Sequence, residues 1–137
     1  MASPNLIDTI QKRALIASDD ELFASLATAL PKDQVDQTAK AASLKPSDIV
    51  QIGRTFYATK LRPAIEDSIC GKLKFCKNRH IYDTAAAITG LVADEAGKVV
   101  AATLQLPPDP TGKAASIAVE FAAAVLKEGL NKLCNCK

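Results

Sequence analysis

Apolar residues in the first part of the chain recur every three or four positions, the spacing that places side chains on one face of an α-helix. Leu6, Ile10 and Ala14 form such a face after Pro4, a residue suited to the first turn of a helix. This pattern predicts a first helix that ends at about Ile16.

A second helix has the clearest start in the sequence. Ser18 and Glu21 have the Ser-x-x-Glu spacing, in which the two side chains satisfy free amide groups of the first helical turn. Apolar residues then continue at helical spacing until Pro31. A shorter third helix is predicted over residues 33–42.

The apolar spacing resumes after Ser47 and includes Ile52 and Phe56. Pro63 then lacks an amide donor, and its ring collides with the preceding helical turn. We therefore expect the helix to kink or end near Arg62, with a continuation from Pro63 to about Leu73.

The second half of the chain predicts two more apolar helices. One covers residues 81–93, with Gly97 as its stop, and the other runs from about residue 114 to residue 133. Residues 99–106 fit a strand or a short helix, and the proline-rich residues 107–112 predict a loop.

These elements predict one all-α domain, residues 1–137, built as a bundle of five to seven helices. A chain of this length buries a single core, and the dominance of Ala and Leu over aromatic residues (4%) favours packing of helix on helix. The residues expected to be buried in this core are Leu26, Phe56, Ile88, Ile117 and Phe121.

The residue inventory disfavours the common enzyme classes. His80 is the only histidine, and the six glycines form neither a dinucleotide-binding nor a phosphate-binding loop. The net charge of +2 is far from the strongly basic balance of nucleic-acid-binding proteins. We therefore expect neither an enzyme nor a nucleic-acid partner.

Four cysteines form two groups, Cys70 with Cys76 and Cys134 with Cys136. Zinc prefers four ligands in two closely spaced pairs, so one hypothesis is a structural zinc site at Cys76, His80, Cys134 and Cys136. Cys70 is a poor ligand for this site, because six positions on a helix turn it about 240° away from Cys76.

Two alternatives to the zinc site remain open at this point. In the first, which we favour, all four cysteines are free, and Cys70 and Cys134 are small core residues. Apart from the zinc of the first hypothesis, no cofactor is expected. In the second, disulfides join the two groups. Residues 99–106 are too few to cross the bundle as a helix, so residues 98–112 are expected to stay at the far end as a connector. The last helix is then expected to return and bring the two cysteine groups together.

A basic segment adjoins the first cysteine group. Lys72, Lys74, Lys77 and Arg79 place four positive charges close together, beside the aromatic ring of Phe75. Such a cluster suits an anionic ligand or an acidic partner. The alternative is a solvated face balanced by carboxylates elsewhere.

The function predicted from the sequence is a non-enzymatic helical module that binds an unidentified protein. The alternatives are a small thiol or structural-metal protein, and a helical protein that acts on an anionic surface or a membrane. The apolar stretches at 85–93 and 114–126 are too short to span a bilayer. No secretory signal pattern is visible after Met1, so a soluble, cytoplasmic protein is expected.

Overall fold

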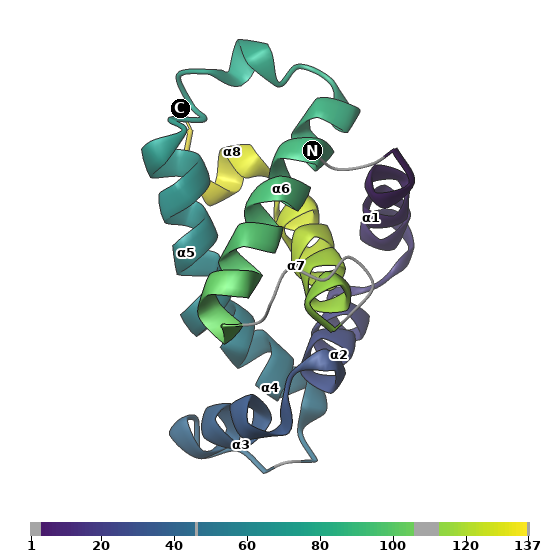
Figure 1. The fold of residues 1–137 in the computed structure, drawn as a ribbon, viewed down its shortest axis with the longest axis vertical. Coiled ribbons are helices and arrows are strands. Elements are labelled where there is room, and N and C mark those ends of the chain that lie inside the picture. Colours follow the sequence, from purple (N-terminus) through teal and green to yellow (C-terminus); the bar gives the residue numbers. More distant parts are fainter. Residues whose placement is uncertain (1–3, 46, 106–112, 137) are drawn as a thin grey trace.

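The computed structural model describes residues 4–45, 47–105 and 113–136, and it is all-α, as the sequence predicts (Figure 1). Seven helices make up the described part of the chain, within the predicted range, if the continuous run from residue 49 to residue 72 is counted once and the three-residue η3 is left out. The elements are α1 (Pro4–Ile16), α2 (Asp19–Ala29), α3 (Lys32–Ala41), α4 (Ile49–Phe56), η1 (Tyr57–Leu61), α5 (Arg62–Glu66), η2 (Asp67–Lys72), the short η3 (Arg79–Ile81), α6 (Ala85–Leu104), α7 (Lys113–Glu128) and α8 (Leu130–Leu133).

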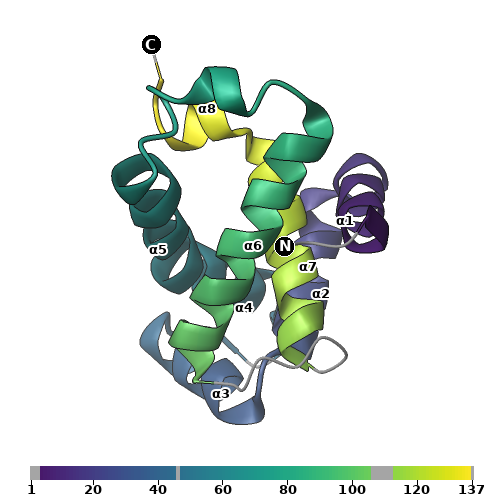
Figure 2. The same cartoon turned by 45° about the horizontal axis from the view of Figure 1, so that its top comes forward.

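Helices α6 and α7 form the centre of the bundle and lie side by side in both views (Figures 1 and 2). Helices α1 and α2 pack on α7, α4 packs on α2, and α5 packs on α6. The segment between η2 and α6 crosses one end of the molecule together with α8, while α3 lies at the opposite end (Figure 1). None of the described helices has the length and apolar content that crossing a bilayer requires.

The core prediction is confirmed at four positions and wrong at one. Leu26, Phe56, Ile117 and Phe121 are buried in one cluster that extends through the bundle. Ile88 is only partly buried at the edge of that cluster. Its helix has an apolar face wider than the surface its neighbours cover, which periodicity alone does not reveal.

The predicted start of α2 is confirmed. Ser18 has an extended backbone, and its hydroxyl accepts a hydrogen bond from the Glu21 amide at 3.2 Å. Three carboxylates follow in the first turn, where the positive end of the helix dipole favours them.

Pro63 does not end its helix. The α-helical pattern stops at Phe56, widens into the π-helical turn η1, and resumes at Arg62, so that Pro63 lies in the first turn of α5. The Arg62 amide donates to the carbonyl of Tyr57, five residues earlier. A wider turn thus accommodates the missing donor and the bulk of the proline ring without breaking the helix.

Gly97 does not end a helix either, because α6 continues to Leu104. The strand alternative for residues 99–106 is therefore wrong for the described residues up to Gln105. Glycine inside a helix costs about 1 kcal/mol relative to alanine. Burial of Val99, Val100 and Leu104 against the core outweighs that cost. The predicted loop at 107–112 lies outside the described residues.

Helices α2 and α4 approach closely at Gly53, which is buried. A Cβ atom at this position would lie 1.8 Å from the carbonyl oxygen of Phe23 and 2.6 Å from its carbonyl carbon. Because both atoms belong to the backbone, one helix would have to shift. The absence of a side chain at Gly53 therefore fixes the distance between α2 and α4.

We predict that Gly53→Ala lowers the free energy of unfolding by about 3 kcal/mol, at the upper end of the usual cost of overpacking. The matched control is Gly97→Ala, where nothing lies within 4 Å of the added methyl group. This change should raise stability by about 0.5–1 kcal/mol. Urea titrations of both variants measure the two effects, and equal stability of the variants would contradict the close approach of α2 and α4.

Candidate functional site

Two disulfides join η2 and the turn that follows it to the C-terminal part of the described chain. Cys70 is bonded to Cys134 and Cys76 to Cys136, with Cα atoms 5.2 Å and 5.4 Å apart. Both distances lie in the usual range for a disulfide. The expected proximity of the two cysteine groups is therefore confirmed, and the alternative that holds in this structure is the pair of disulfides.

The zinc hypothesis is not supported in this structure. Cys76, Cys134 and Cys136 are in disulfides, whereas zinc binds deprotonated thiolates. The fourth expected ligand, His80, is exposed in η3. No group of three or more potential metal ligands occurs in the part of the chain that the structure describes. The prediction of free thiols is likewise wrong here, since all four cysteines are paired.

The segment between the two disulfides has a fixed backbone. The Phe75 amide donates to the carbonyl of Ile69, and Lys74 adopts a left-handed conformation with φ of 51°. The Asn78 side-chain amide donates to the carbonyls of Leu73 and Lys74 at 2.9 and 3.2 Å. These bonds hold the chain in a tight, defined turn at the end of the bundle.

The turn buries its aromatic residue and exposes its cations. Phe75 is 3% exposed and stacks on Tyr82, with ring centroids 6.1 Å apart. The four residues predicted to contact an anion or a partner are all exposed, namely Lys72, Lys74, Lys77 and Arg79. The four cations thus form an exposed basic surface, whereas the ring of Phe75 faces the core and does not belong to that surface.

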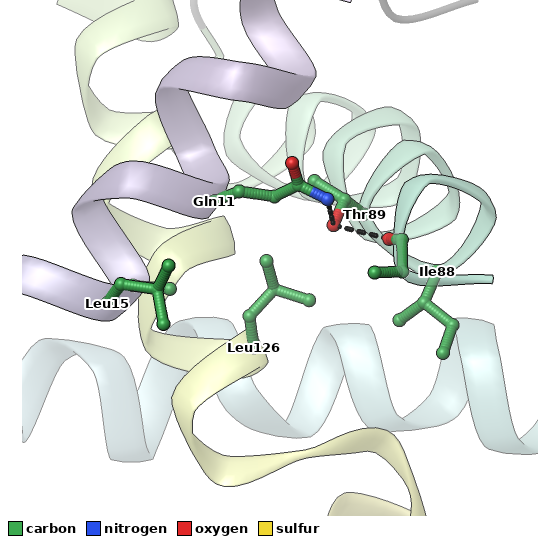
Figure 3. A pocket seen from close by; sticks show the side chains of 7 residues that line it. Gln11, Leu15, Ile88, Thr89 and Leu126 are labelled. Atoms are coloured by element: carbon green, nitrogen blue, oxygen red, sulfur yellow. Dashed lines mark hydrogen bonds between the residues drawn. The ribbon is translucent and has the colours of Figure 1, made fainter.

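A first hollow of about 340 Å³ opens between α1, the start of α6 and the end of α7 (Figure 3). Its lining is mostly apolar, and Leu15, Ile88 and Leu126 supply its large side chains. Among the described lining residues, the polar side chains are Gln11 and Thr89, and the Gln11 amide donates a hydrogen bond of 3.4 Å to the Thr89 hydroxyl. Ile88, which we expected in the core, is thus a wall of this hollow.

A second hollow of about 380 Å³ adjoins the first and shares Ile88 and Leu126 with it. It continues to Phe75 and to the junction of α7 with α8, where residues 128–132 form its wall. We call the two hollows together the apolar trough. Because α8 is held by Cys134, one wall of the trough depends on the disulfide-bonded end.

An ion pair anchors the end of α7 that turns into α8. The Arg62 guanidinium donates to both carboxylate oxygens of Glu128, at 2.6 Å from Nη2 and 3.0 Å from Nε, and the Tyr57 hydroxyl is 3.3 Å away. These hydrogen bonds and the guanidinium charge lower the pKa of Glu128, although burial opposes the shift. Burial and the nearby Glu128 carboxylate raise the pKa of Tyr57. The phenol therefore stays neutral, and the network serves as a structural anchor.

Gly129 follows this anchor with φ of 89°, a left-handed conformation that side chains other than glycine rarely adopt. It changes the direction of the chain between α7 and α8. The anchor and this turn together place Leu130 and Leu133 in the core.

Comparison of the chain with family models, with curated proteins and with solved structures gave no match.

The Glu128 anchor gives a pH-dependent prediction. Because the pKa of Glu128 is lower in the folded chain than its ordinary value of 4.5, the ionised carboxylate stabilises the fold at pH values above 4.5. This contribution to stability is lost as the pH falls through the lowered pKa. Glu128→Gln should therefore lose roughly 2 kcal/mol of unfolding free energy at neutral pH. The difference from the parent chain should shrink as the pH falls below 4.5.

Urea titrations across this pH range measure the effect. Asp36→Asn is the control, because Asp36 is an exposed carboxylate of α3. A stability difference between the parent chain and Glu128→Gln that stays constant down to the acid limit would contradict the assigned role of Glu128.

Proposed function

We propose that this chain is a non-enzymatic module that binds a partner protein in the apolar trough. The observation that carries the proposal is the combination of an open apolar hollow with large apolar side chains left exposed at its rim. Leu15 is 84% exposed in the last turn of α1, and its neighbour Ile16 is 78% exposed. No other large apolar side chain in the described residues is as exposed as these two.

The energetics favour a partner that covers this rim. Removing a leucine or isoleucine side chain from water contributes about 1.5–3 kcal/mol. Leu15 lines the first hollow beside Ile88 and Leu126, so a partner seated there would cover it, and a partner that extends over the end of α1 would cover Ile16 as well. Exposed apolar patches next to a groove are typical of interaction sites.

An amphipathic helix is the kind of partner segment that suits this shape. Grooves between helices accept apolar anchors spaced three or four residues apart on such a segment. Gln11 and Thr89 supply polar groups in the wall of the first hollow, and polar groups of this kind fix the orientation of a ligand. The proposal requires no cofactor and no catalytic residue.

The two disulfides support an oxidising compartment rather than the cytoplasmic setting expected from the sequence. Glutathione and thioredoxin keep thiols reduced in the cytosol, whereas disulfides persist in secreted and periplasmic proteins and in the lumen of the endoplasmic reticulum. We therefore place the proposed binding activity in such an environment.

A photo-crosslinking amino acid in place of Ile16 tests the proposal. In the compartment where the protein is produced, it should yield discrete covalent adducts with a partner protein. Leu15→Asp, combined with the crosslinker at residue 16, should abolish them, because a carboxylate at the rim opposes burial in an apolar contact. Since Leu15 and Ile16 are exposed, neither change should affect stability.

The control carries the crosslinker at Ile49, which is 43% exposed on α4 and lies outside the trough. Its adducts should differ from those at residue 16 and should not respond to Leu15→Asp. Identical adducts at both positions, or adducts at residue 16 that survive Leu15→Asp, would contradict the assignment of the trough.

A further inference from the structure

The disulfide-bonded end of the molecule has a basic surface that the proposed trough function does not use. Residues 71–82 contain four lysine or arginine residues and no carboxylate. The disulfides bring this segment against α8, which adds the exposed Lys132. We call the basic cap the set of Lys72, Lys74, Lys77, Arg79 and Lys132.

Three lysines of the cap have no carboxylate partner among the described residues. Six lysine and arginine residues elsewhere form ion pairs with carboxylates, namely Lys12, Arg13, Arg54, Arg62, Lys98 and Lys127. Lys72, Lys74 and Lys77 form no ion pair with any carboxylate that the structure describes. Their positive charge is therefore available to an external anion.

The opposite end of the molecule has no such excess of positive charge. Helix α3, which lies at the far end from the segment between η2 and α6 (Figure 1), contains two lysines and two carboxylates. The basic cap is therefore the more positive of the two ends, although the net charge of the chain is only +2. An anionic surface would attract the molecule with the basic cap foremost.

The neighbouring side chains distinguish between kinds of anion. Single-stranded nucleic acids stack their bases on exposed aromatic rings, but Phe75 is buried and packs on Tyr82. Ile81 is instead 57% exposed, two residues after Arg79. Lysines beside an exposed aliphatic side chain suit a membrane surface, where phosphates lie above a hydrocarbon layer.

We propose that the basic cap docks the protein on a membrane that contains anionic phospholipids, with Ile81 inserted at the level of the headgroups. The cap is rigid before it binds, because the disulfides and the Asn78 hydrogen bonds fix the turn. Little ordering entropy is then lost on docking. This inference goes beyond the trough, because Lys72, Lys74, Lys77 and Ile81 line neither hollow, and Lys132 is the one cap residue that also lines the second hollow.

Sedimentation with lipid vesicles tests the proposal on the full, oxidised chain. The protein should bind vesicles of phosphatidylcholine mixed with phosphatidylserine, and it should not bind vesicles of phosphatidylcholine alone. Binding should weaken with added salt. Each cation near an anionic surface contributes about 1 kcal/mol, so K72A/K74A/K77A should weaken binding roughly a hundredfold.

The matched control is K32A/K40A/K45A, which removes the same charge from exposed positions at and near α3. It should retain most of the affinity, whereas Ile81→Ser should weaken binding without changing the salt dependence. Circular dichroism of each variant verifies the fold.

Three results would overturn the proposal. The first is equal affinity for vesicles with and without phosphatidylserine, or no binding to either. The second is an equal loss in the two triple variants, which would indicate a response to net charge alone. The third is tighter binding to a single-stranded or duplex oligonucleotide than to the anionic vesicles, which would assign the cap to nucleic acid.

Discussion

The pair of disulfides between residues 70–76 and residues 134–136 is the constraint on which the rest of the structure depends. Helix α8 has only four residues and follows a turn at Gly129, so its own hydrogen bonds are too few to keep it in place. Its position is set by the Arg62–Glu128 anchor before it and by the Cys70–Cys134 and Cys76–Cys136 bonds at its end. Leu130 and Leu133 are buried as a result.

The two bonds do not contribute equally. Closing the first loop, with a sequence separation of 64, stabilises the fold by roughly 4 kcal/mol through the lower entropy of the unfolded chain. Once it is closed, the second bond completes a ring of only about ten residues, worth roughly 3 kcal/mol. What the second bond adds is therefore local. It holds the turn with Lys74 and Lys77 against α8, and this arrangement creates both the basic cap and one wall of the trough.

Much of the fold follows from local sequence signals. Helix starts such as Ser18, and core positions such as Phe56 and Phe121, are set by capping and by periodicity, which act over a few residues. The wrong prediction at Gly97 depends on contacts with residues far along the chain. Gly97 stays helical because Val99 and Val100 are buried in the core, and that burial is not visible in the neighbouring residues. The irregularity expected near Arg62 is present as a π-helical turn, although the helix does not end there.

The candidate site was less predictable than the fold. The basic residues and the proximity of the cysteines followed from composition and from the length of the connecting segment. The pairing did not, because four cysteines allow three connectivities and sequence does not choose among them. The trough was missed because Ile88 and Leu126 have the pattern of core residues. Only the packing of α1 against α6 and α7 shows that they are left partly uncovered.

The most direct test of this account is to map the cysteine bonds by mass spectrometry. The chain is produced in an oxidising compartment, denatured and alkylated without reductant, and then digested. We predict that no cysteine is alkylated and that peptides are linked Cys70 to Cys134 and Cys76 to Cys136. Four alkylated cysteines, or links between Cys70 and Cys76 or between Cys134 and Cys136, would contradict the constraint from which the trough and the basic cap are derived.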